Sequence, residues 1–170
     1  DELTHPDAMI ETRTLSAVSF GTAAGGARTP HRHDYHELLW IRTGEGHHRI
    51  DGERFTLHPR SITLIGRGQV HVMEHAVGID GFVVRFREEM LADGGPAWLL
   101  RATAIRSVLV PPSDAPHVDN LLATLDAQLH QPADACTVDV QRHLLSAVLL
   151  LVQLWLDASQ LERPEAADTL

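Results

Sequence analysis

Hydrophobic and polar positions between about residues 30 and 86 fall into short runs, which is the pattern of β-strands. The runs end at turn-forming residues at fairly regular spacing. They cover residues 36–42, 47–50, 54–57, 61–65, 71–75 and 81–86. Asp51-Gly52, between the second and third runs, is a typical two-residue hairpin turn. Many short strands at this spacing predict an antiparallel sandwich or barrel.

The segments on either side of these strands have weaker patterns. Residues 1–30 are mixed, with turn signals at Gly21 and at Gly25-Gly26, and no strand is predicted there. Residues 88–107 are expected to be irregular or partly helical, and residues 108–112 to form a last strand before a proline stop.

The apolar period changes to that of helices after residue 112. A first helix is predicted over 116–131, because four leucines share one of its faces: Leu121, Leu122, Leu125 and Leu129. Pro132 separates it from a second helix over 137–158, for which Thr137 is the expected N-cap. That second helix is apolar almost all round, so it must be covered on two sides. A partner subunit is the simplest second cover; burial within one chain, or cover by a further domain, is the alternative.

These patterns predict one domain with a short tail. Residues 1–112 would form the β-barrel with an N-terminal arm, and residues 113–160 the two-helix dimerisation segment of the same domain. Residues 161–170 are acidic and contain a proline, and are expected to be a linker.

Composition narrows the class of protein. The formal charge is −9 and all 14 basic residues are arginine, so this segment is not expected to clamp nucleic acid itself. Arginine without lysine suggests a GC-rich bacterial genome. A single cysteine allows no intrachain disulfide, and no signal peptide is visible. The apolar stretch 144–156 is shorter than the ~20 residues that span a bilayer, so a cytoplasmic, non-membrane protein is predicted.

Three residues in one short stretch of the chain carry the candidate chemistry. His31, His33 and Glu37 have the same parity, so in an extended chain their side chains share a face. Two imidazoles and a carboxylate can hold a divalent metal, and His71 from a neighbouring strand would complete the set. We therefore predict His31, His33, Glu37 and His71 as metal ligands, for zinc, nickel or iron. The same four residues and Met73 are the predicted ligand-binding residues.

Other histidines are assigned to less central positions. His36 has the opposite parity and is expected to be exposed. His47 and His48 are also expected to be exposed, although one of the two must point inward. Arg42 lies opposite the face of His31 and His33 and is left out of the predicted site.

The spacing of the candidate ligands resembles that of the cupin superfamily. Its first motif has a Gly, then His-x-His, a Glu and a second Gly, and Gly25, His31, His33, Glu37 and Gly44 match every position. The resemblance implies a fold that is mostly β, with a cupin (double-stranded β-helix) barrel, here followed by two C-terminal α-helices.

The second cupin motif is only partly kept. Gly68 and His71 match its later Gly and its His, whereas Gly66 stands at its Pro and His75 at its Asn. Arg60 stands where the motif has its first Gly.

Within the cupins, residues 15–160 resemble the N-terminal domain of AraC-type regulators. The resemblance rests on the run from His31 to Glu37, the Gly44–Gly46 turn, the hairpin to Leu57, the turn before His71 and the strand ending at Phe86. It implies a barrel that senses a small molecule or metal effector and a homodimer formed through the C-terminal helices. DNA would be bound only through a C-terminal helix-turn-helix domain that lies outside this chain.

Two other functions fit the same residues. The alternative function is a stand-alone metal-dependent cupin enzyme, a dioxygenase or an isomerase, because three imidazoles and a carboxylate can leave metal positions open for substrate. A purely structural dimerisation module with an empty barrel is the third reading.

Overall fold

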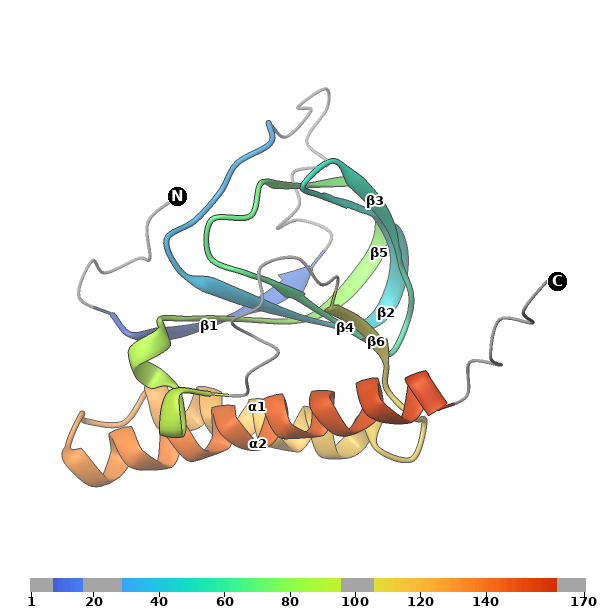
Figure 1. The fold of residues 1–170 in the computed structure, drawn as a ribbon. Helices are drawn as coiled ribbons and strands as arrows, with labels where there is room; N and C mark the ends of the chain where they lie inside the picture. Colours follow the sequence, from blue (N-terminus) through green and yellow to red (C-terminus); the bar gives the residue numbers. More distant parts are fainter. Residues whose placement is uncertain (1–7, 17–28, 96–105, 162–170) are drawn as a thin grey trace, which may run out of the picture.

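The computed structural model describes residues 8–16, 29–95 and 106–161, which form a bent antiparallel sheet and two helices (Figure 1). The strands are β1 (Ile10–Ser16), β2 (His36–Ile50), β3 (Glu53–Leu57), β4 (Ser61–Ile65), β5 (His71–Phe86) and β6 (Arg106–Leu109). The helices are α1 (Ala115–Leu129) and α2 (Ala135–Leu161). The predicted order of strands followed by two helices is confirmed.

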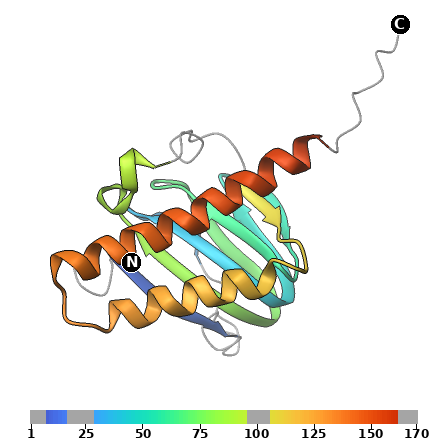
Figure 2. The same cartoon turned by 90° about the horizontal axis from the view of Figure 1, so that it is seen from below.

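The strands pair in the order β1-β5-β2-β4-β6, with β3 added to β2, and every pairing is antiparallel. Among the described residues this sheet does not close on itself, so the cupin-like fold is a strongly curved open sheet. Both helices lie side by side against one face of it (Figure 2). The opposite, concave face encloses a cavity.

Alternation along the strands builds a separate core on each face. One face of β2 and β5 packs on the helices through residues such as Leu38, Trp40 and Val84. The next residue along each strand turns to the concave side, where Leu39, Ile41 and Val83 form the second core.

The predicted runs 36–42 and 47–50 are one strand, β2, and the runs 71–75 and 81–86 are one strand, β5. The two pair along most of their length, with register shifts between Ile41 and His47 where both bend. Gly44 makes this bend possible: its φ is +93°, and a Cβ there would lie 2.5 Å from the carbonyl carbon of Gly78. The pattern between residues 42 and 47 looked like a loop because the strand bends there.

Two strand predictions need correction. β1 was missed, although it pairs with β5 from Ile10↔Phe86 to Ser16↔Asp80. The last strand is Arg106–Leu109 rather than 108–112. The described part of residues 88–107 contains two short 3-10 helices, Glu88–Met90 and Ala92–Gly94, as expected. Residues 96–105 lie outside the described residues. The turn signals predicted at residues 21 and 25–26 also lie outside them.

The helix boundaries follow the prediction closely, except for one cap. α2 begins at Ala135, and Oδ1 of Asp134 accepts hydrogen bonds from the backbone N–H and the hydroxyl of Thr137, at 2.7 and 2.9 Å. Asp134, not Thr137, therefore satisfies the free amides of the first turn. These bonds also lower the pKa of the Asp134 carboxyl.

The long helix α2 has two apolar sides, as the sequence indicated. Its inner side lies in the core with α1 and the sheet through Leu145, Val148, Leu149, Val152 and Trp155. On the outer side Leu150 and Leu154 are 60% and 63% exposed. Its segment Ala135–Ala158 is long and apolar enough, at a mean hydropathy of 1.4, to cross a membrane by length and composition alone; the sequence prediction considered only 144–156. The packed inner side is that of a core helix, which passes the same test.

Candidate functional site

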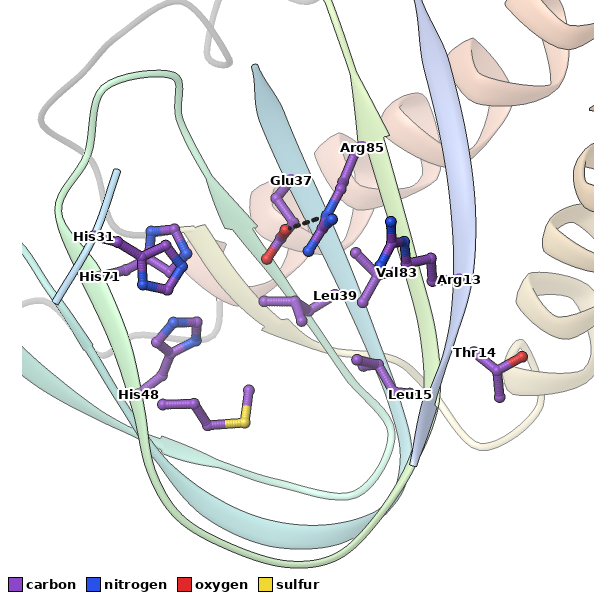
Figure 3. A pocket seen from close by; sticks show the side chains of 11 residues that line it. Arg13, Thr14, Leu15, His31, Glu37, Leu39, His48, His71, Val83 and Arg85 are labelled. Atoms are coloured by element: carbon purple, nitrogen blue, oxygen red, sulfur yellow. Dashed lines mark hydrogen bonds and ion pairs between the residues drawn. The ribbon is translucent and has the colours of Figure 1, made fainter. Parts of the chain in front are cut away.

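A cavity of about 260 Å³ lies on the concave side of the sheet (Figure 3). Strands β1, β2 and β5 supply most of its wall, and His31 comes from the segment before β2. The lining residues are Arg13, Thr14, Leu15, His31, Glu37, Leu39, His48, His71, Met73, Val83 and Arg85. The cavity thus has an imidazole-rich side, a charged side and apolar walls.

Three of the predicted metal ligands come together beside this cavity. Backbone bonds fix two of them: the His31 N–H donates to the His71 carbonyl at 3.0 Å, and the His71 N–H donates to the His31 carbonyl at 2.8 Å. The Gly68 N–H donates to the His33 carbonyl at 2.8 Å and holds the third. One ligand atom from each of the three lies within 4.8 Å of the others. Their ring centroids are 4.5 to 5.0 Å apart.

The surroundings favour the neutral form of these imidazoles. Burial, with further contributions from neighbouring histidines, lowers the pKa of His33 to about 4 despite the opposing charge of Glu37. Burial also lowers the pKa of His71. Neutral imidazoles keep a lone pair for a metal at neutral pH. The donor set therefore fits zinc, nickel or iron(II), which imidazole ligands suit.

Glu37 lines the same cavity but its carboxylate is engaged elsewhere. Nε of Arg85 donates to its Oε2 at 2.8 Å, and Nη1 of Arg85 also donates to Oε1 of Glu11 at 3.2 Å. Arg85 lies over the Tyr35 ring at 5.7 Å, and burial raises the pKa of Tyr35 to about 12. Glu37 does not belong to the group of three imidazoles, so its role as a metal ligand stays a prediction.

Met73, the fifth predicted ligand-binding residue, also lines the cavity. It stands opposite His48 in the β2–β5 pairing. Together with Leu15, Leu39 and Val83 it gives the cavity apolar walls. All five predicted residues are therefore near one cavity, although His33 is buried beside it and is not among the lining residues.

His48 is the inward-pointing residue of a pair that was expected to be largely exposed. It is 1% exposed and faces the cavity, so the prediction that one of His47 and His48 points inward holds, but its exposure does not. Burial, and then His71 and His31 nearby, lower its pKa to about 3. Ile50 was the usable signal, because this apolar residue has the same parity as His48 and lies in the core on the concave side.

His36 was also expected to be exposed and is buried. Its Nδ1 accepts a hydrogen bond from the Arg67 N–H at 3.1 Å, and its Nε2 lies 3.3 Å from Oε1 of Glu88. Its parity was correct, because its side faces away from the cavity toward Phe86. The prediction was wrong because it took the outer face of the sheet to be exposed to solvent, whereas other parts of the chain cover that face.

Arg42, which was left out of the predicted site, is not among the residues that line the cavity. Its guanidinium bonds to Asp80 and, at 3.1 Å, to Asp119 of α1. Nε1 of Trp40 donates to the same Asp119 carboxylate at 2.8 Å. These residues connect the sheet to the helices rather than to the cavity.

Arg13 and Arg85 were missed as lining residues. Arg85 has the parity of Val83 in a recognised strand, so alternation along that strand could have found it. Arg13 lies in β1, a strand that the sequence pattern did not reveal.

Residues 16–149 match the family of AraC-like ligand-binding domains. The match covers most of the chain, which belongs to this family. The fold and cavity described above are thus those of a ligand-binding domain that resembles regulators rather than enzymes. No protein with curated annotation matches the sequence.

One solved structure supports the fold, and two others show a weaker likeness. The apo form of a ToxT variant from Vibrio cholerae superposes with a TM-score of 0.54 at 10% identity, over 87% of this chain and 57% of that one. The AraC-like transcriptional activator CuxR gives 0.48 at 13% identity, over 83% of this chain and 48% of its own. A cupin protein from Bacteroides fragilis gives 0.37 at 20% identity, over 56% and 76% of the two chains. The chain spans about half the length of the two regulators.

Proposed function

We propose that this chain is the effector-sensing and dimerisation part of a bacterial AraC-type transcription regulator, and that its effector occupies the cavity. The observation that carries the proposal is the cavity itself, which lies inside an AraC-like ligand-binding domain and presents imidazoles, an arginine–carboxylate pair and apolar walls. A site of a few polar groups among apolar walls is typical of small-molecule binding. The family favours this role over a stand-alone cupin enzyme.

A divalent metal is proposed as part of the effector site. His31, His33 and His71 would hold zinc, nickel or iron through one nitrogen each. Bound there, the ion would supply positive charge and open coordination positions for a small molecule. The residues of the chain would orient that molecule: Arg13 and Arg85 face the cavity with charge, and Leu39 and Val83 with apolar surface.

The metal proposal is tested by elemental analysis and a thermal shift. Protein purified without added metal should contain near one divalent ion per chain, or its melting temperature should rise when zinc, nickel or iron(II) is added. The His33→Ala variant should lose both effects, because it removes one of three ligands. His130→Ala, at an exposed histidine on the first helix's C-terminal end, is the matched control and should keep them. Metal near zero and no shift in the unaltered protein would contradict the proposal.

Dimerisation is proposed to use the outer side of α2. Val140, Leu144, Ala147, Leu151 and Leu154 follow one another at alternating spacings of four and three, which form an apolar stripe of the kind that pairs helices. Leu154 is 63% exposed in the single chain, so a second copy would bury it. We call these five residues the outer stripe.

DNA would be bound by a domain outside this chain, in a cytoplasmic protein. The net charge of −9 makes the chain a poor partner for phosphates. Reading the gene beyond residue 170 tests this part, and two helix-turn-helix units are expected there. A gene with no such units would contradict the regulator proposal.

A further inference from the structure

We propose that His48 is the fourth side-chain ligand of the divalent ion, in the place that the sequence motif gives to Glu37. The proposal rests on the metal site proposed above, and it assigns a ligand that lies outside both cupin motifs. Three observations support it: the position of His48 beside the three imidazoles, the lack of hydrogen-bond partners for its ring nitrogens among the described residues, and the ion pair between Glu37 and Arg85.

Strand register brings His48 to the three imidazoles. His48 of β2 stands opposite Met73 of β5, and His71 lies two residues before Met73 on the same face. His48 and His71 are therefore diagonal neighbours, and their ring centroids are 5.4 Å apart. The two side chains lie on the same side of the cavity in Figure 3.

The separations among the rings of His31, His33 and His71 fit one shared ion, and the ring of His48 lies just beyond that range. A metal–nitrogen bond of about 2.1 Å places an imidazole centroid roughly 3.2 Å from the metal, so two rings at tetrahedral or octahedral angles lie about 4.5 to 5.3 Å apart. The observed separations are 4.5, 4.8 and 5.0 Å within the group of three and 5.4 Å from His48 to His71. Since His48 is not within the 4.8 Å group, its side chain must rotate toward the ion on binding.

His48 also has nothing else to bond to. Both of its ring nitrogens are buried, and among the described residues neither has a hydrogen-bond partner. Buried polar groups are nearly always hydrogen-bonded, so an exception needs an explanation. A ligand in the cavity that accepts a nitrogen lone pair supplies one, and a metal ion is the ligand that the neighbouring imidazoles favour.

Glu37 is less free to bind an ion. Its Oε2 lies 2.8 Å from Nε of Arg85, whose side chain is only 18% exposed. Turning the carboxylate to the metal would take a counter-charge from a largely buried guanidinium, which is costly. His48 breaks no such pair, and this difference favours His48 as the fourth ligand.

Cobalt(II) titration of the full chain tests the assignment, because the visible d–d bands of the ion change with its ligands. The unaltered protein should bind one Co²⁺ per chain. His48→Leu should weaken Co²⁺ binding by at least ~10-fold and shift the bands, since ligand loss is expected to cost at least as much as the loss of a supporting partner. Glu37→Gln should stay within about threefold, because the amide oxygen can still accept from Arg85.

Two further variants separate ligation from folding. His47→Leu changes the adjacent, half-buried histidine of the same strand, which points to the other face, and should leave the bands unchanged. His48→Ala should lose binding and regain it when free imidazole is added, because imidazole can enter the vacated space. A circular dichroism melt of each metal-free variant checks that it folds.

Each outcome decides one claim. If the unaltered protein binds no Co²⁺, the metal site itself fails and this assignment with it. If it binds and His48→Leu stays within twofold while Glu37→Gln loses binding, the motif's glutamate is the ligand and the present proposal is overturned. His48→Ala could also lose Co²⁺ binding without regaining it when imidazole is added. If metal-free His48→Ala and His48→Leu are both folded, that result would contradict the assignment of His48 as a ligand.

Discussion

His48 makes the metal-free protein sensitive to acid. The folded protein holds the pKa of His48 at about 3, against 6.5 for an unhindered histidine, chiefly because the ring is buried. Between these two values the unfolded chain binds a proton that the folded chain does not. The contribution of His48 to the free energy of unfolding is therefore fully present above about pH 6.5, and it decreases as the pH falls toward 3.

Substitution of His48 should remove much of this pH dependence. Between pH 7 and pH 5 the His48 contribution to the free energy of unfolding falls by about 2 kcal/mol, so the fall in His48→Leu should be smaller than in the unaltered protein by about that amount. Urea unfolding in the presence of a chelator at the two pH values measures it. Equal pH dependence in both proteins would show that His48 is not buried in the neutral form. His33 has a lowered pKa as well and should account for part of what remains.

Parity in an extended chain grouped the candidate residues of the site, although only Glu37 lies in β2 and the two histidines precede it. His31, His33 and Glu37 were placed on one face from their positions alone, and Arg42 was excluded by the same reasoning. The engagement of Glu37 by Arg85 could not be predicted, because it depends on the pairing of β2 with β5. The burial of His36 also depends on elements that are distant in the sequence.

Among the elements, strands β2 and β5 form the central pair of the sheet, and their backbones are closely packed. Both are long, and the backbone of Gly81 lies close to that of Trp40. A Cβ on Gly81 would lie 1.9 Å from the carbonyl oxygen of Trp40, which no side-chain rearrangement can relieve.

The Gly81→Ala variant should therefore be strongly destabilised. We expect a loss of roughly 3 kcal/mol or more in the free energy of unfolding, because the two backbones must move apart. Gly66→Ala is the matched control, since the nearest atom to its Cβ is the flexible side chain of Gln69 at 3.2 Å. Chemical denaturation measures both, and comparable losses in the two variants would refute this account of the close approach.

Elements with a simple period were predicted almost to the residue. The helices and the hairpin after β2 follow from local spacing and turn chemistry. The bends in β2 and β5 were interpreted as breaks, because a register shift interrupts alternation in the same way as a loop. β1 was missed since an edge strand that contacts both the cavity and α1 has no clean alternation: its burial varies along its length.

At the scale of the whole molecule, the two apolar sides of α2 have different roles: one packs in the core and the other is the proposed dimer contact. The inner side completes the core. Within the outer stripe, Val140 and Leu154 are exposed in a single chain, whereas Leu144 and Leu151 are partly buried against the core. Leu149 and Val152 are fully buried on the inner side, so a charge there would test the core and not the interface.

A charge on the outer stripe should separate the dimer without unfolding the chain. The unaltered protein should sediment at about twice the monomer mass of 18.7 kDa. Leu154→Glu should raise the dimer dissociation constant by at least ~10-fold, because symmetry buries the new charge in both copies. Ala123→Glu, at an exposed site on α1, is the control and should stay dimeric. A monomeric unaltered protein at micromolar concentration would contradict the proposal for the outer stripe.

The sequence by itself determined both helices, most of the strand segments and the faces of their side chains, because alternation, helical period and turn residues are local properties of the chain. It therefore predicted an antiparallel sandwich or barrel, two helices and a set of histidines on one face, and the motif resemblance implied the cupin fold. Only the tertiary structure decided which groups meet across strands: the three imidazoles with His48, and Glu37 with Arg85. These contacts depend on strand register and on the bend near Gly44, which join residues far apart in the chain and leave no local pattern.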